Sequence, residues 1–123
     1  MAKNDTVIIY EKPTCSTCNA AMALLRDMGV QFEKVDYYEA PLTEEKLAEL
    51  VRKMDITPRE LLRTHEPIYK ELGLADRLKD GSVTDSELIA LMVAHPDLMQ
   101  RPIVEKGDRA VLGRPVENLK QLI

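Results

Sequence analysis

Two cysteines three positions apart, Cys15 and Cys18, stand where a short β-branched run meets an apolar stretch with helical spacing. The run Val7–Tyr10 predicts a buried strand, which Pro13 ends. Because the apolar residues that follow recur at the period of one helix face, the first sulfur is expected at a helix N-terminus. Unpaired backbone N–H groups and the helix dipole favour a thiolate there. Cys15 is therefore the candidate nucleophile.

Composition and charge limit the partners that we expect. The net charge of −4 at pH 7 gives no overall attraction to nucleic acid or to an anionic membrane. No segment approaches the roughly 18 apolar residues of a membrane helix, and the first residues do not lead into a signal peptide, so we predict a cytoplasmic protein. In a reducing cytosol, a Cys-x-x-Cys pair indicates redox or metal chemistry. His65 and His95 lack ligand spacing with the cysteines, so no metal site is predicted.

A second strand is expected near residues 32–35, after Gly29 ends the first helix. A helical crossover of this length predicts that the two strands are parallel, which makes a βαβ unit. Helix starts then dominate residues 43–95. Thr57 precedes Pro58 and a capping-box glutamate, Thr84 and Glu87 repeat the capping box, and Thr43 precedes two glutamates.

The end of the chain returns to strand signals. Two apolar runs, near residues 101–105 and 110–113, flank a Gly-Asp turn and predict a hairpin, and residues 115–123 predict a closing helix. The predicted architecture is a single α/β domain over residues 1–123. It combines a βαβ unit with a ββα unit, and a helical insert of about 43–95 separates the second and third strands.

Several separated motifs resemble the glutaredoxin-coupled arsenate reductases, a thioredoxin-superfamily group related to Spx-like proteins. They are Tyr10 to Cys15, Leu61-Leu62-Arg63, Pro67 to Leu74, His95-Pro96, Arg101-Pro102-Ile103-Val104 and Gly113-Arg114-Pro115. The resemblance runs from about Val7 to the C-terminus and implies a thioredoxin-like fold. It also implies that Pro102 is the cis proline beside the active-site cysteine.

The resemblance further implies an oxyanion site and a role in arsenic resistance. Family members place three arginines around the cysteine, and the matching positions are Arg63, Arg101 and Arg114. The implied mechanism starts when the Cys15 thiolate attacks arsenic and expels water; a thiol then reduces the arsenic, and arsenite leaves. In the family that thiol is glutathione, and glutaredoxin clears the mixed disulfide. We expect glutathione as a co-substrate, no bound cofactor, and a monomer.

Cys18 leaves the reductant open. It is expected one helical turn from Cys15, within reach of a disulfide, so it could resolve the intermediate and pass electrons from thioredoxin or glutaredoxin. The other interpretation is that Cys18 only packs in the first turn of the helix.

Two further functions share these motifs. One is an Spx-like regulator that binds RNA polymerase and uses the cysteine pair as a redox switch; the other is a general glutathione-dependent thiol oxidoreductase. Arg114 favours the reductase, because an arginine in Gly-Arg-Pro is typical of that branch. Glu11 and Asn19 stand where well-known reductases have a histidine and an arginine. A less positive pocket is therefore expected.

Overall fold

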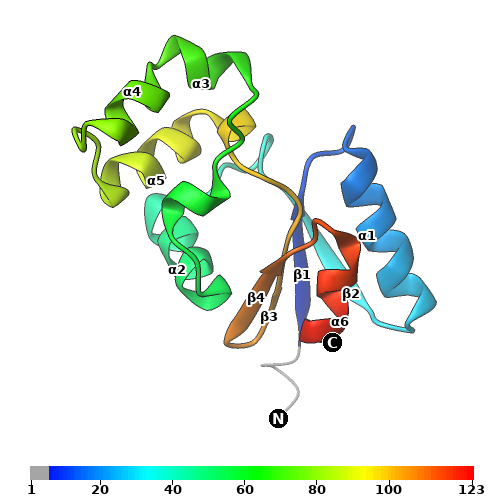
Figure 1. Ribbon diagram of the computed structural model, residues 1–123. Coiled ribbons are helices and arrows are strands. Elements are labelled where there is room, and N and C mark those ends of the chain that lie inside the picture. The colour runs from blue at the N-terminus through cyan, green and yellow to red at the C-terminus, as the bar shows by residue number, and fades with distance from the viewer. Residues whose placement is uncertain (1–5) are drawn as a thin grey trace. The chain divides into compact units, whose positions relative to one another are not determined.

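The computed structural model describes residues 6–123 (Figure 1). The chain forms two compact units, one of Met1–Pro41 with Arg101–Ile123 and the other of Leu42–Gln100. The expectation of one domain over residues 1–123 stays a prediction. No helix within residues 6–123 is long and apolar enough to cross a membrane.

The first unit is built on a four-stranded sheet in the order β2-β1-β3-β4. The strands are β1 (Val7–Glu11), β2 (Phe32–Asp36), β3 (Ile103–Lys106) and β4 (Arg109–Leu112). β1 pairs in parallel with β2 and antiparallel with β3, and β3 pairs antiparallel with β4. The expected βαβ unit and hairpin are both confirmed.

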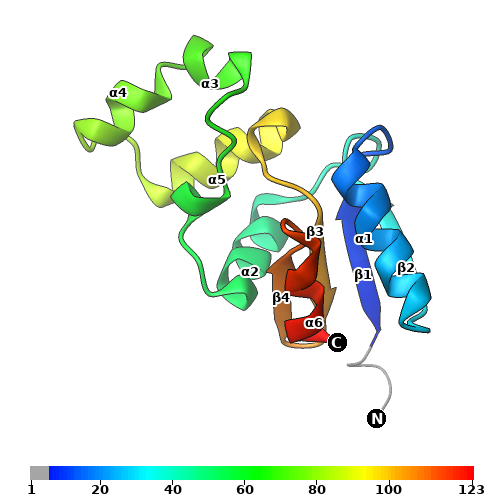
Figure 2. The ribbon, with the colours of Figure 1, turned by 45° about the vertical axis from the view of Figure 1, so that its right-hand side comes forward.

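Two helices cover one face of this sheet, as Figure 2 shows. They are α1 (Ser16–Asp27) and α6 (Leu119–Leu122), the latter preceded by a 3-10 turn, Val116–Asn118. Side chains alternate across a strand, so Val7 and Ile9 point to the same face of β1. The core on this face consists of Val7, Ile9, Ala21, Met22, Leu25, Val104, Leu119 and Leu122. Burying this apolar surface holds α1 on β1 and so fixes where the first turn of α1 begins.

α1 ends as its sequence predicts. Gly29 adopts a φ of +72°, its N–H donates to the Arg26 carbonyl at 3.0 Å, and the Val30 N–H donates to the Leu25 carbonyl at 2.9 Å. A residue with a side chain is strained in this left-handed conformation, which is why glycine is common just beyond a helix. The chain can then turn back into β2.

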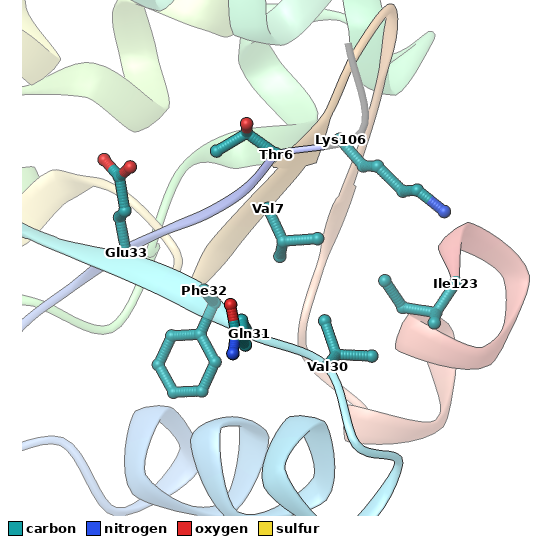
Figure 3. A pocket seen from close by; sticks show the side chains of 8 residues that line it. All are labelled: Thr6, Val7, Val30, Gln31, Phe32, Glu33, Lys106 and Ile123. Carbon is teal, nitrogen blue, oxygen red and sulfur yellow. The ribbon is translucent and has the colours of Figure 1, made fainter. Parts of the chain in front are cut away.

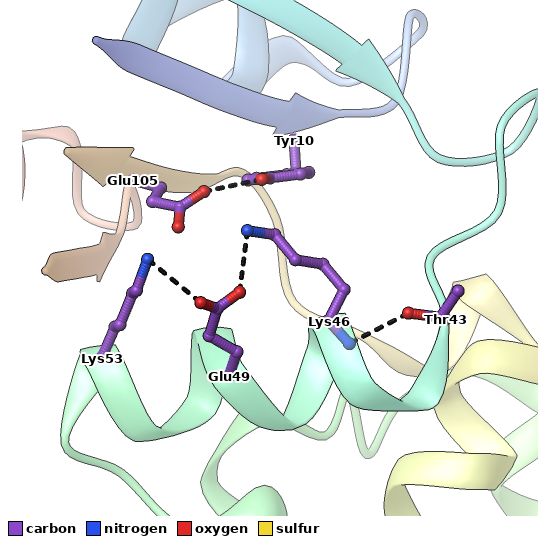
Figure 4. Close-up of polar contacts among 6 residues, drawn as sticks. All are labelled: Tyr10, Thr43, Lys46, Glu49, Lys53 and Glu105. Carbon is purple, nitrogen blue, oxygen red and sulfur yellow. Dashed lines mark hydrogen bonds and ion pairs between the residues drawn. The ribbon is translucent and has the colours of Figure 1, made fainter. Parts of the chain in front are cut away.

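The second unit is helical throughout its regular elements, as expected for the insert. Its elements are α2 (Glu44–Met54), a 3-10 turn (Pro58–Leu61), α3 (Pro67–Glu71), α4 (Leu74–Lys79), α5 (Asp85–Ala94) and a second 3-10 turn (Pro96–Leu98). Thr43 caps α2 by accepting a hydrogen bond from the Lys46 N–H at 3.0 Å (Figure 4). Along α2, Glu49 pairs with Lys46 at 3.0 Å and with Lys53 at 3.6 Å.

The helix start at Thr57 produces only a single 3-10 turn. Thr57 and Glu60 do form the expected capping box. The chain then leaves helical geometry, because the Arg63 N–H donates to the Leu98 carbonyl at 2.7 Å and the Gln100 N–H donates to the Leu61 carbonyl at 2.9 Å. These bonds join the segment after the turn to residues 98–100, so the helix does not continue.

Candidate functional site

Cys15 occupies the N-cap position of α1, as the sequence predicts. Its backbone is extended, with φ −90° and ψ 118°, and its Sγ accepts a hydrogen bond from the Cys18 N–H at 3.2 Å. The Cys15 N–H in turn donates to the Lys12 carbonyl at 3.0 Å, which closes the loop between β1 and α1. The sulfur therefore takes the place of a capping oxygen and lies at the positive end of the helix.

The surroundings of Cys15 favour its thiolate. Its side chain is only 8% exposed, and this burial by itself raises the pKa. Hydrogen bonds from the side chain and backbone of Cys18, together with the charge of Arg101, outweigh the burial and lower the pKa below its ordinary value. A buried sulfur that is nevertheless easily ionised is a suitable nucleophile.

Cys18 has the opposite character. It is 0% exposed, and burial, followed by the hydrogen bond that its thiol gives to Cys15, raises its pKa to about 12. Both cysteines are free. The two sulfurs of the motif thus differ: the pKa of Cys15 is lowered, and Cys18 is held as a thiol that donates a hydrogen bond to it.

Arg101 hydrogen-bonds to Cys15 and brings further donors to this turn. The side chain is 8% exposed, and within residues 6–123 its buried Nε and Nη1 have no hydrogen-bond partner. The peptide bond that follows it, Arg101–Pro102, is cis. Buried donors without partners are rare in proteins because each costs free energy, so they often mark a place where a ligand binds.

Tyr37 shares this surrounding and was missed by the sequence reasoning. Its hydroxyl is buried without a partner in the described chain, its side chain is 2% exposed, and it interacts electrostatically with Arg101 and Cys18. Burial, with Tyr38 as a smaller cause, raises the Tyr37 pKa, so the hydroxyl keeps its proton. A usable signal existed: β1 and β2 are parallel, so residues just after both strands gather at the same edge of the sheet.

Arg114 reaches the same turn of α1 from the other end of the chain. Its Nη2 donates to Thr17 Oγ1 at 2.9 Å. The loop is held by Gly113, whose N–H donates to the Pro102 carbonyl at 2.8 Å and at which a Cβ would lie 2.8 Å from Pro102 Cγ. Only glycine allows this close approach. The Arg114–Pro115 bond is also cis.

Arg63 lies in the second unit. Its Nε and Nη2 both donate to Glu66 Oε2, at 3.2 and 3.1 Å. Of the three predicted arginines, the first unit therefore brings Arg101 and Arg114 to residues 15–18, here called the cysteine turn. The part of Arg63 in the site stays a prediction.

Glu11 is a buried carboxyl at the end of β1. It is 5% exposed, and burial, followed by the negative charge of Asp36, raises its pKa, while Lys34 acts in the opposite direction. Glu11 lines a cavity of about 350 Å³ together with Pro13, Asn19, Met22, Lys34 and Asp36. The expectation that Glu11 makes the surroundings of the cysteines less positive stays a prediction.

A larger cavity, of about 550 Å³, lies at the opposite end of β1 (Figure 3). It is lined by Thr6, Val7, Val30, Gln31, Phe32, Glu33, Lys106 and Ile123, which include no cysteine or histidine. Within residues 6–123, no three histidine, cysteine or acidic side chains gather closely enough to hold a metal ion. The candidate site is accordingly the cysteine turn.

Comparison with known proteins places the chain among relatives that cover nearly its whole length. The sequence model of the ArsC family matches residues 10–122. An uncharacterised protein of Escherichia coli (strain K12), YfgD, is 39% identical over 118 residues, which are 95% of this chain and 96% of that protein. An arsenate reductase of Yersinia enterocolitica is 39% identical over 111 residues, 90% of this chain and 76% of that enzyme. The solved structure of an arsenate reductase from Vibrio cholerae has a TM-score of 0.89 at 33% identity, over 97% of this chain and 98% of that one.

Proposed function

Since this chain belongs to the ArsC family and has its thioredoxin-like fold, we propose that it reduces arsenate to arsenite at Cys15. The observation that carries the proposal is the meeting of an ionisable sulfur with unpartnered donors: the Cys15 thiolate is stabilised beside Arg101, whose Nε and Nη1 are buried without partners in the described chain. Arsenate is a tetrahedral oxyanion, and a guanidinium offers it both charge and directed hydrogen bonds.

The chemistry follows from these groups. The Cys15 thiolate attacks the arsenic(V) atom, an S–As bond forms, and one arsenate oxygen leaves as water after protonation. A second thiol then attacks the Cys15 sulfur. An S–S bond forms, the electron pair of the S–As bond passes to arsenic, and the resulting arsenic(III) leaves as arsenite. The two electrons come from the two thiols, so no bound redox cofactor is needed.

We propose separate tasks for the three arginines. Arg101 lies beside the reacting sulfur and would bind the oxygens that gain charge as arsenic is attacked. Arg114 is held on Thr17, in the first turn of α1, and would bind a further oxygen at the helix N-terminus. Arg63 is proposed as the third member because it occupies the matching Leu-Leu-Arg position.

The second thiol is proposed to be glutathione, with glutaredoxin clearing the mixed disulfide, or Cys18, with thioredoxin reducing the Cys15–Cys18 disulfide. Cys18 suits the second route because its side chain already forms a hydrogen bond with Cys15. We further propose a cytoplasmic monomer whose partners are arsenate and these thiol donors.

The test is arsenite production by the purified protein, first with glutathione and glutaredoxin and then with thioredoxin and its reductase. Cys15→Ser should abolish turnover under both conditions. Cys18→Ser should abolish only turnover that depends on thioredoxin. Failure of the unaltered protein to produce arsenite under either condition would remove the arsenate proposal.

Glu11 favours a second candidate, a glutathione-dependent thiol oxidoreductase that does not act on arsenate. A buried carboxyl close to the cysteine turn opposes the approach of an oxyanion to the extent that it is ionised. The same preparations should then reduce a mixed disulfide of glutathione without forming arsenite. The Spx-like alternative stays a prediction from the shared motifs.

A further inference from the structure

Glu11 is a buried ionisable group that the reaction described so far does not use. Glu11 is the last residue of β1, and it is 5% exposed. Burying a carboxyl is costly, and a chain that needed only to fill this space would be more stable with an apolar residue. The position therefore calls for a chemical explanation.

The pleat of β1 places Glu11 under α1. Successive side chains of a strand alternate, so Glu11 points to the same face as Val7 and Ile9, the face on which α1 packs. From above, α1 turns Cys18 toward the sheet, together with the buried residues Ala21, Met22 and Leu25. Glu11 and Cys18 thus enter the same buried layer, and the charge of Glu11 acts on Cys18.

A cavity connects this layer to polar groups. Glu11 lines it with Asn19 of α1 and with Lys34 and Asp36 of β2. Its volume of about 350 Å³ is ample for water, since one water needs only about 10–15 Å³ of such space. A proton on Glu11 therefore has a route to other carriers that does not pass through Cys15.

We propose that Glu11 accepts the proton of the Cys18 thiol when Cys18 attacks a mixed disulfide on Cys15. In this step the Cys18 sulfur bonds to the Cys15 sulfur, the bond from Cys15 to the outer thiol breaks, and the outer thiolate leaves with the electron pair. The proton of Cys18 passes to the Glu11 carboxylate and from there into the cavity. The proposal rests on the resolving role suggested above for Cys18.

Cys18 needs such a partner more than Cys15 does. Burial, the largest cause of the raised Cys18 pKa, persists when Cys15 is in a mixed disulfide, so Cys18 keeps its proton, and a thiol is a poor attacking group. Burial raises the pKa of Glu11 above that of an ordinary carboxyl, which makes its carboxylate a stronger base.

The charges that face Glu11 set the pH at which it can act. From β2, Asp36 raises the Glu11 pKa and Lys34 lowers it, and in α1 the charge of Glu11 acts on Cys18. On the β3 side, Tyr10 pairs with Ile103, so the next position beside Glu11 is the uncharged Pro102.

The experiment follows the two cysteines without arsenate. The reduced protein is mixed with a symmetrical nitroaryl disulfide, whose thiolate product absorbs visible light. Cys15 releases the first equivalent and becomes the mixed disulfide; Cys18 then releases the second equivalent as the Cys15–Cys18 disulfide closes. Two phases and two equivalents are expected, and Cys18→Ser should retain only the first. Because arsenate is absent, failure of arsenate reduction does not affect the result.

In Glu11→Gln, the second phase should slow about tenfold or more at pH 7 while the first phase stays within about twofold. The pH profile should also change. In the unaltered protein the second-phase rate rises as Glu11 ionises and then levels, whereas in Glu11→Gln it should rise steadily with hydroxide. Glu33→Gln is the matched control on the neighbouring strand, because Glu33 is exposed and should leave both phases unchanged.

Two charge variants test the same idea without altering Glu11. Asp36→Asn should move the second-phase midpoint to lower pH, and Lys34→Gln should move it to higher pH. Asparagine keeps an oxygen for the bond that Asp36 Oδ1 accepts from the Tyr38 N–H at 2.9 Å. A structural role for Glu11 predicts no such opposite shifts.

An unchanged second phase in Glu11→Gln would overturn the proposal, and so would the release of only one equivalent by the unaltered protein. If Glu11→Gln does not fold, the two charge variants decide, and midpoints that fail to move in opposite directions would also overturn it.

Discussion

At the scale of single residues, the two buried cysteines of the cysteine turn have pKa values shifted in opposite directions. Cys15 accepts hydrogen bonds from its surroundings, whereas Cys18 keeps its proton, donates a hydrogen bond to Cys15 and is buried. Arg101 and Tyr37 retain buried polar atoms that no described residue satisfies. Such a site is unfavourable without a ligand, which is a common cost of a preorganised binding site.

The pH dependence of Cys15 alkylation should show the effect of Arg101. The rate of reaction with iodoacetamide rises with pH as the thiol ionises, and its midpoint should lie below that of an ordinary cysteine because the pKa is lowered. In Arg101→Met the midpoint should move to higher pH, since a positive charge beside the thiolate is lost. Arg109→Met, which removes an exposed arginine of β4, is the control. An unmoved midpoint in Arg101→Met would show that the guanidinium does not stabilise the thiolate.

Arg114 should act on the oxyanion and not on the sulfur. Arg114→Ala removes a guanidinium that is held on Thr17 Oγ1, so kcat/KM for arsenate should fall about tenfold to a hundredfold, the usual value of a charged hydrogen bond. The alkylation rate of Cys15 should remain close to that of the unaltered protein. Equal losses in both measurements would instead indicate general damage to the turn.

At the scale of elements, side-chain caps mark where α1, α2 and α5 begin. α5 illustrates this: the Thr84 hydroxyl accepts from the Glu87 N–H at 3.1 Å, and Glu87 Oε1 accepts from the Thr84 N–H at 2.8 Å. These reciprocal bonds satisfy two backbone donors that the helix itself leaves unpaired.

Thr84→Ala should lower the free energy of unfolding by about 1 kcal/mol, because it leaves a backbone N–H of α5 without its side-chain acceptor. Urea denaturation followed by circular dichroism measures the change. Ser86→Ala is a suitable control, since Ser86 is an exposed residue in the same first turn. A loss in Ser86→Ala as large as that in Thr84→Ala would mean that the capping bonds are not the cause.

At the scale of the whole molecule, we expect the two compact units to unfold together. Each has its own buried core, represented by Ile9 in the first and Leu50 in the second, both 0% exposed. A chain of this length with one cooperative core should show a single transition.

Leu50→Ala should lower the free energy of unfolding by about 2–5 kcal/mol, since it leaves a cavity in a filled core. If the chain is one cooperative domain, the slowest-exchanging amides of β1 should lose protection by the same free energy. Ile9→Ala is the reciprocal variant, and it should lower the protection of α2 and α5. Protection of β1 that survives Leu50→Ala would show that the units unfold separately.

Local signals account for what the sequence by itself determined. The junction at Cys15, the end of α1 at Gly29, the capping boxes and the Gly-Asp hairpin each depend on a few consecutive residues whose conformational preferences agree. These elements, in this order, are sufficient to predict a βαβ unit, a helical insert and a ββα unit.

Tertiary structure alone decided the properties that depend on segments far apart in the chain. Backbone hydrogen bonds between residues 61–63 and residues 98–100 limit the helix predicted to start at Thr57 to one turn. The packing of α1 on β1 buries Glu11 and Cys18 together, and the close approach of Gly113 to Pro102 brings Arg114 to the cysteine turn. The sequence identifies which residues can ionise, but their burial and their neighbours set each pKa, and these exist only once the chain has folded.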